Sequence, residues 1–188
     1  MHLHSESPFS ASDVEALQPG LLGRAAVRSV ATVSPVRGMN FVCVELNGLE
    51  DLAAVGVNGR SAAVKLDAEW DVGFVGMLFY VRTGEDMAEG KDGERKRVVK
   101  LRTRMIEGNL EDPATGSASC AVSALLSLRG ERRERERIVG YELTQGVEMG
   151  RQSDIGIEVT LNEGLDGVER LEMSGSSVKV MEGVVEYE

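Results

Sequence analysis

The stretch from Ser117 to Leu128, SASCAVSALLSL, constrains the fold more than any other part of the sequence. It is made almost wholly of small and apolar residues, and it follows a loop rich in Gly, Asn, Asp and Pro, so we predict a helix over 117–128. A helix without a polar stripe must be buried on every side. Its serine hydroxyls can bond to carbonyls one turn earlier, which makes their burial tolerable. The rest of the chain therefore has to surround this helix.

Short apolar and β-branched segments on both sides of the helix predict strands, and a charged run at 131–137 predicts a solvated face or helix end. A Ser12-x-x-Glu15 capping box predicts the start of one further short helix, and the segment 49–57 predicts another. The polar stretch 83–96 reads as an exposed loop. Many antiparallel strands around one buried helix make an α+β fold. Strands are expected at 26–34, 40–46, 72–81, 97–106, 138–146, 154–163, 168–175 and 176–186.

Charge and composition exclude several classes of function. The 188 residues contain 21 Lys and Arg against 31 Asp and Glu, a net charge of −10, which argues against a nucleic-acid partner. The basic residues between 91 and 104 are expected on a solvated strand edge, which their charge protects from aggregation. No apolar run is long enough to span a bilayer, so no membrane association is expected. Two cysteines make no disulfide framework, and a reduced, cytoplasmic location is the simpler interpretation.

The turn before the helix is the best candidate for a functional site. Pro113 fixes its own backbone and biases Asp112 to an extended conformation, while Gly116 allows close approach of another group. The free amide hydrogens of the first helical turn and the helix dipole favour a carboxylate or phosphate above Thr115 and Gly116. A carboxylate beside such an anion has its proton affinity raised, which would suit Asp112 to proton transfer. The alternative is that Thr-Gly-Ser merely caps the helix.

The segment EDPATGSASCA at 111–121 resembles the signature of the PhzF-like, or phenazine-biosynthesis-like, proteins, which are structural relatives of diaminopimelate epimerase. The segments 38–55, 102–106, 145–155 and 176–186 agree with that resemblance. It implies a fold of two similar halves, each a strongly curved, mostly antiparallel sheet wrapped around a central buried helix, with the active site between them. It also implies isomerisation or epimerisation by proton transfer on a small carboxylate-bearing metabolite, without metal or organic cofactor.

The resemblance also implies roles for individual residues. Asp112 corresponds to the signature aspartate near the reacting centre, and the backbone at Gly116 and Ser117, beside Thr115, to the amides that hold the substrate carboxylate. Arg151 and Ser153 would help to line the cleft, or alternatively anchor a turn between two strands. The turn that carries a cysteine base in the epimerase relatives has no thiol here, and Cys120, one helical turn further on, is expected to be packed.

The chain begins where the family's linker between halves begins, so we expect residues 1–11 to be a tail and 12–188 to be a C-terminal domain. The general base and the histidine that the family supplies from its N-terminal half would then be missing. His2 and His4 match no family motif, and no further ligands are in view for a metal on this pair. We expect a homodimer or a separate N-terminal half as partner. The alternatives are a non-catalytic paralogue that binds small acids or a protein, and an incomplete coding sequence.

Overall fold

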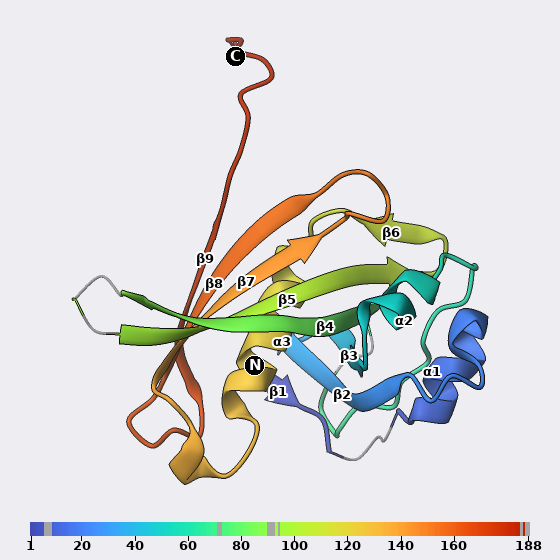
Figure 1. The fold of residues 1–188 in the computed structure, drawn as a ribbon, viewed down its shortest axis with the longest axis horizontal. Coiled ribbons are helices and arrows are strands. Elements are labelled where there is room, and N and C mark those ends of the chain that lie inside the picture. The colour runs from blue at the N-terminus through green and yellow to red at the C-terminus, as the bar shows by residue number, and fades with distance from the viewer. Residues whose placement is uncertain (6–8, 71–72, 90–92, 94, 185, 187–188) are drawn as a thin grey trace.

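A strongly curled sheet wraps around the central helix α3 (Gly116–Leu128) in the computed structural model (Figure 1). The structure describes residues 1–5, 9–70, 73–89, 93, 95–184 and 186. Within these residues the strand order is β1-β2-β3-β4-β5-β7-β8-β9, and β6 pairs with β5 on the side. The strands are β1 (His2–Leu3), β2 (Val27–Val36), β3 (Met39–Leu46), β4 (Phe74–Glu89), β5 (Arg95–Glu107), β6 (Leu110–Asp112), β7 (Ile138–Gln145), β8 (Ser153–Leu161) and β9 (Val168–Gly175).

Most neighbouring strands run antiparallel, and among the described strands only the pairs β3–β4 and β5–β7 are parallel. A parallel pair needs a crossover between its strands. The first crossover contains the short helix α2 (Leu49–Ala54), and the second contains α3. The predicted α+β class and the mostly antiparallel, strongly curved sheet around a buried helix are therefore confirmed.

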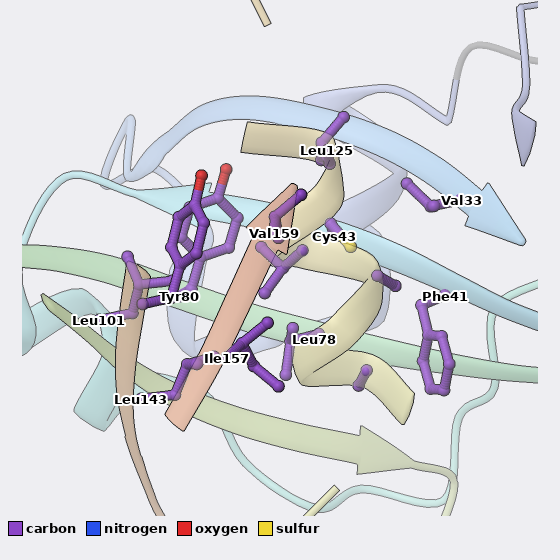
Figure 2. Close-up of a cluster of buried hydrophobic side chains, with 14 of the residues drawn as sticks. Val33, Phe41, Cys43, Leu78, Tyr80, Leu101, Leu125, Leu143, Ile157 and Val159 are labelled. Atoms are coloured by element: carbon purple, nitrogen blue, oxygen red, sulfur yellow. The ribbon is translucent and has the colours of Figure 1, made fainter. Parts of the chain in front are cut away.

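Helix α3 is buried on nearly every side, as its composition requires. The inner face of the sheet supplies the surrounding side chains, among them Phe41, Leu78, Tyr80 and Leu143, and Figure 2 shows them packed about the helix. The helix begins at Gly116, one residue before the predicted start. Small residues on α3 explain the tight curl of the sheet, because they let strands from several directions approach the helix axis closely.

The outer face of the same sheet carries a second core. Helix α1 (Ala11–Leu17), helix α2 and the segment 55–66 cover the outward side chains of β3 and β4, such as Val42, Val44 and Phe79. Both faces of these two strands are thus buried, which explains why 40–46 and 72–81 are almost continuously apolar rather than alternating. None of the helices in the described ranges is long and apolar enough to cross a membrane.

The N-terminal residues differ from their prediction as a tail. His2–Leu3 form the edge strand β1 against β2, and the His4 side chain is buried. The first helix starts at Ala11 instead of after Ser12, because Ser10 and Asp13 form the capping box. This pair overlaps the predicted one and lies two residues earlier in the chain, and both of its capping hydrogen bonds form.

The connector predicted as a loop at 83–96 is mostly a hairpin. Strand β4 continues to Glu89 and β5 starts at Arg95, so both strands project beyond the rest of the sheet (Figure 1). Residues 82–86 are exposed, which removes the apolar alternation that identifies a strand in a sequence. Among the described charged residues of this hairpin, Glu85, Asp86, Glu89 and Arg95 are exposed, as predicted, whereas Lys96 is half-buried beside Glu158.

Strand β5 is not the solvated edge that its basic residues predicted. It lies between β4 and β7, and its cations pair with acids on neighbouring elements, as Lys100 does with Asp86 at 2.6 Å and Arg102 with Glu148 at 3.0 Å. Arg104 is buried. Lys91, also assigned to that edge, lies outside the described residues. Residues 176–184, part of the strand predicted at 176–186, belong to no strand and run away from the body.

Candidate functional site

The Asp112 carboxylate is held by the turn that follows β6. Its Oδ1 accepts a hydrogen bond from the Ala114 amide at 3.2 Å, and its Oδ2 accepts one from the Thr115 hydroxyl at 2.7 Å. Pro113, which lies between Asp112 and Ala114 in the chain, restricts the backbone of the turn. Both carboxylate oxygens thus have a donor, and each keeps a lone pair for a further contact. The turn fixes the position of Asp112 directly before α3.

The N-terminus of α3 carries no side-chain cap in the described part of the chain. Thr115 occupies the N-cap position, but its hydroxyl donates to Asp112 instead of accepting from the helix. The first helical hydrogen bond runs from the Ser119 amide to the Thr115 carbonyl at 3.0 Å. The amides of Gly116, Ser117 and Ala118 precede it and have no intrahelical acceptor. The sequence interpretation of Thr115 as an ordinary cap is therefore wrong, and the positive end of the helix is left to another acceptor.

Gln145 at the end of β7 positions this turn. Its Nε2 donates to the Asp112 carbonyl at 2.6 Å and to the Thr115 hydroxyl oxygen at 3.0 Å, and its Oε1 faces the Thr103 hydroxyl at 3.5 Å. The side chain is fully buried. Hydrogen bonds thus run in one direction, from Gln145 to Thr115 to Asp112. No role was predicted for Gln145, although a glutamine directly before Gly146 at the end of a predicted strand was a usable signal.

A buried ion pair anchors the other side of β6. Arg104 donates from Nε to Glu111 Oε1 at 2.7 Å and from Nη2 to Glu111 Oε2 at 2.8 Å, a bidentate geometry. Its Nη1 also donates to the carbonyls of Leu52, at 3.1 Å, and of Val55, at the end of α2. Glu111 precedes Asp112, so this network fixes the backbone that carries the candidate catalytic carboxylate.

The turn between β7 and β8 packs directly against the Asp112 loop. Gly146 has a positive φ of 76°, and a Cβ there would lie 2.4 Å from the Arg151 carbonyl oxygen and 2.9 Å from that of Pro113. The Arg151 amide closes the turn by donating to the Gly146 carbonyl at 2.8 Å. Only glycine permits this close approach. The backbone hydrogen bond of Arg151 supports the alternative that this residue anchors the turn between two strands. Its side chain is exposed.

A cleft of about 530 Å³ adjoins the start of α3, between β8, β9 and the residues that follow β9. Gly116 and Ser153 line it, together with Met173, whose sulfur would lie 2.6 Å from a Cβ at Gly116. The cleft thus brings together two of the six predicted site residues. Asp112, Thr115, Ser117 and Arg151 do not line it, although the first three are close to Gly116 in the chain.

Neither cysteine is placed to act as a base. Cys120 is packed against the inner core, as predicted, and burial raises its thiol pKa. Burial raises the pKa of Cys43 to about 12, and its side chain lies among the core residues of Figure 2. A thiol with a raised pKa stays protonated near neutral pH, so it is a poor nucleophile and a poor base. The geometry leaves Asp112 as the candidate proton-transfer group of the turn.

The family model described as phenazine biosynthesis-like protein matches residues 90–183, which is half of the chain. This chain belongs to that family. The matched range includes all six residues predicted for the site, namely Asp112, Thr115, Gly116, Ser117, Arg151 and Ser153. The family assignment made from the residues at 111–121 is confirmed.

Comparison with solved structures adds one member of the same family. A phenazine biosynthesis protein of the PhzF family from Bacillus anthracis is 13% identical, with a TM-score of 0.49. The match covers 79% of this chain and 48% of that one, so the chain spans about half the length of the solved structure. No curated protein matches the chain.

Proposed function

We propose that this chain forms one half of an isomerase centre that moves a proton on a small carboxylate-bearing metabolite, without a metal or organic cofactor in that step. The observation that carries the proposal is the pairing of an oriented carboxylate, Asp112, with the uncapped N-terminus of the buried helix α3. One group suits proton transfer and the other suits the negative charge of a carboxylate. Family membership supports an isomerase-like chemistry.

In the proposed reaction the substrate carboxylate accepts hydrogen bonds from the amides of Gly116 and Ser117. Removal of a proton from the adjacent carbon places the electron pair of the broken C–H bond in the carboxylate, as an enediolate. The helix-start amides stabilise that added charge because they are already oriented toward it. Asp112 takes up or returns a proton, and return at a different position or face completes the isomerisation.

The complementary acid–base group would come from outside this chain. A second copy, or a separate N-terminal half, would close the cleft beside Gly116 and supply the group on the other side of the substrate. The chain spans about half the length of the solved family structure, and a centre built between two halves suits that span. We therefore include a homodimer or a second half in the proposal.

Carboxylate binding is tested first on the chain alone. Titration with succinate, followed by backbone NMR, should shift the amides of Gly116, Ser117 and Ala118 most. Shifts confined to distant amides would show that the helix start is not the anion site.

Proton transfer is tested by deuterium exchange at the carbon next to the carboxylate, with the chain and its complementary half together. Asp112→Asn should lower exchange by roughly 100- to 10,000-fold, the usual contribution of general acid–base catalysis. Asp154→Asn, which alters an exposed acid in the wall of the same cleft, is the matched control and should keep its rate. Equal rates in the Asp112→Asn variant and the unaltered chain would remove Asp112 from the mechanism.

A non-catalytic binder of small acids is the second candidate. The uncapped start of α3 favours it, since anion binding needs only those amides and no acid–base group from another chain. Amide shifts on titration with succinate, without any exchange under any pairing of halves, would support this alternative. We place either activity in the cytoplasm, because both cysteines are free thiols, which suits a reducing compartment.

A further inference from the structure

We propose that His2, His4 and Asp67 form a binding site for a divalent metal ion of the zinc type. The three side chains offer ligand atoms that all lie within 4.8 Å of one another. His4 is buried, and His2 and Asp67 are half-buried. The sequence places the two histidines 63 or more residues from Asp67, so only the fold brings the three together.

The two histidines share one face because of strand geometry. β1 pairs with β2, and the ladder continues through the His4 amide, which donates to the Thr32 carbonyl at 3.0 Å. Side chains two residues apart on a strand point to the same side. The imidazole rings of His2 and His4 accordingly lie 4.7 Å apart, edge to face.

Asp67 meets both rings with different oxygens. His2 Nε2 lies 2.8 Å from Asp67 Oδ2, and His4 Nδ1 lies 3.8 Å from Asp67 Oδ1. Ligand atoms about 2.0–2.1 Å from a tetrahedral zinc ion are about 3.3 Å apart. The two measured pairs are each within about half an ångström of that spacing, and rotation of the side chains would bring all three ligand atoms, now within 4.8 Å of one another, around one ion. Two imidazoles and one carboxylate are a ligand set that zinc accepts, and they leave the fourth position to water.

The outer contacts of His4 fix its tautomer. The Ser34 hydroxyl donates its single hydrogen to Asn40 Oδ1, so it accepts from His4 Nε2, which lies 2.7 Å away. The proton of the ring therefore sits on Nε2, and the Nδ1 lone pair faces Asp67. Metal-binding histidines characteristically donate their other ring N–H to such a partner. At present the Asp67 amide donates to Nδ1 at 3.1 Å, and a bound ion would replace that hydrogen bond.

Packing around the cluster orients it and leaves one entrance. Trp70 stacks on His2 with centroids 4.8 Å apart and meets His4 edge-on at 5.6 Å. The side chains of His4 and Asp67 are 0% and 14% exposed, whereas that of His2 is 35% exposed. An ion would enter beside His2. Once bound, it would tie the first strand to the segment that precedes β4.

The test uses the whole chain and Zn²⁺ as the probe. His2 and His4 are the only histidines of the sequence, so an NMR spectrum of imidazole carbons and protons contains two ring systems. We expect one equivalent of Zn²⁺ to shift both rings together and saturably. Signals of the His4 ring that stay unchanged would overturn the proposal. If the His2 ring shifts alone, Zn²⁺ is bound by His2 and the amino terminus instead.

Variants test the contribution of each ligand. His2→Gln, His4→Gln and Asp67→Asn should each weaken Zn²⁺ binding by at least about tenfold, because even outer-shell partners contribute roughly 10- to 100-fold. Asp51→Asn is the matched control, since that carboxylate is similarly shielded, at 17% exposed, and pairs with Arg24 instead. Unchanged affinity in Asp67→Asn would overturn the site.

Ser34→Ala provides a variant that keeps all three ligands. It should weaken binding through the tautomer of His4 while leaving the circular dichroism spectrum unchanged. Affinity equal to that of the unaltered chain in Ser34→Ala, together with full affinity in His4→Gln, would show that Zn²⁺ binds only to acidic groups of the surface.

Discussion

At the scale of single residues, the hydroxyl of Thr115 decides what the helix start can do. It has one hydrogen, which goes to Asp112, and its oxygen accepts from Gln145. It makes no hydrogen bond with the amides of α3, although a threonine at an N-cap usually does. One side chain thus orients the candidate catalytic carboxylate and keeps the anion-binding end of the helix free.

Replacement of Thr115 tests this role. Thr115→Val keeps the shape but leaves Asp112 Oδ2 and Gln145 Nε2 each short of a partner, so the free energy of unfolding should fall by about 1–3 kcal/mol. Thr115→Ser keeps the hydroxyl and should lose less. Urea denaturation of the two variants measures the difference. Equal stability would mean that the hydroxyl is not bonded as described.

Gly146 and Gly150 separate backbone strain from steric conflict in one turn. Both have positive φ, 76° and 68°, but only a Cβ at Gly146 would collide with neighbouring carbonyls. Gly150→Ala should cost about 1 kcal/mol from the φ angle alone, within the usual 1–3 kcal/mol for such strain. Gly146→Ala should cost clearly more and should also shift the amide signals of residues 112–116. Thermal unfolding measures both, and a larger loss in Gly150→Ala would contradict the described packing of this turn.

At the scale of elements, helix α3 is tied to the sheet at its C-terminal end by Arg129. Its Nη1 donates to Ser29 Oγ and Glu45 Oε2, both at 3.0 Å, and reaches the Tyr80 hydroxyl at 3.3 Å. These partners stand on β2, β3 and β4. Arg129 therefore connects the C-terminal end of α3 to three neighbouring strands of the sheet.

The Glu45 network predicts a dependence of stability on pH. Burial alone would raise the pKa of Glu45, but the Ser29 hydrogen bond and the charges of Arg82 and Arg129 hold it below its ordinary value. The unfolded chain therefore takes up this proton first as the pH falls. The stabilisation is present above about pH 4.5 and is lost as the pH falls through the folded pKa.

Glu45→Gln should flatten the acid limb of the stability curve measured by urea denaturation between pH 3 and pH 7. Glu50→Gln, at an exposed position of α2, should leave the limb as it is. A curve for Glu45→Gln that is parallel to that of the unaltered chain would contradict the assignment.

Two serines of α3 should respond in opposite directions. Ser119 Oγ donates to the Thr115 carbonyl at 2.9 Å, whereas the buried Ser123 Oγ has no partner within the described ranges. A buried hydroxyl without a hydrogen bond is unfavourable, and alanine is the better helix former. Ser123→Ala should therefore raise the free energy of unfolding by up to about 1 kcal/mol, while Ser119→Ala should lower it. Destabilisation by Ser123→Ala would point to an unrecognised partner.

At the scale of the whole molecule, the segment after β9 holds the most exposed large apolar side chains among the described residues. The side chains of Val178, Val180 and Val184 are 85%, 86% and 92% exposed. They stand at every second or fourth position, as apolar residues on one face of a strand do, although 176–184 form no strand. Such a segment gains by pairing with a sheet edge or by burial against another chain. We expect the chain to associate with itself in solution.

Light scattering over a range of concentrations measures this association. The mass should rise above 20.3 kDa with concentration, and Val178→Glu with Val180→Glu should lower it again. Val57→Glu, at an exposed apolar position elsewhere, is the control. A mass of one chain at all concentrations would contradict the expectation.

The sequence by itself determined the central helix, the fold class and the family. These follow from local information. A helix made of small and apolar residues has to be buried on every side. The segment 111–121, which carries the family resemblance, is contiguous in the chain. The grouping of Asp112, Thr115 and Gly116 at the start of α3 followed for the same reason, because the turn and the helix start are formed by neighbouring residues. The positions of the strands could be predicted wherever at least one face of the strand is buried, because burial requires apolar residues in a recognisable pattern.

The tertiary structure decided the contacts between residues distant in sequence. Gln145 reaches the Asp112 turn only because β7 lies beside β5, and Arg104 is buried only because β5 is central and α2 covers it. The hairpin at 83–96 lacked an apolar pattern because it projects into solvent. His2 and His4 meet Asp67 across more than sixty residues. Pairings of this kind depend on strand order and sheet curvature, which no local pattern of residues encodes.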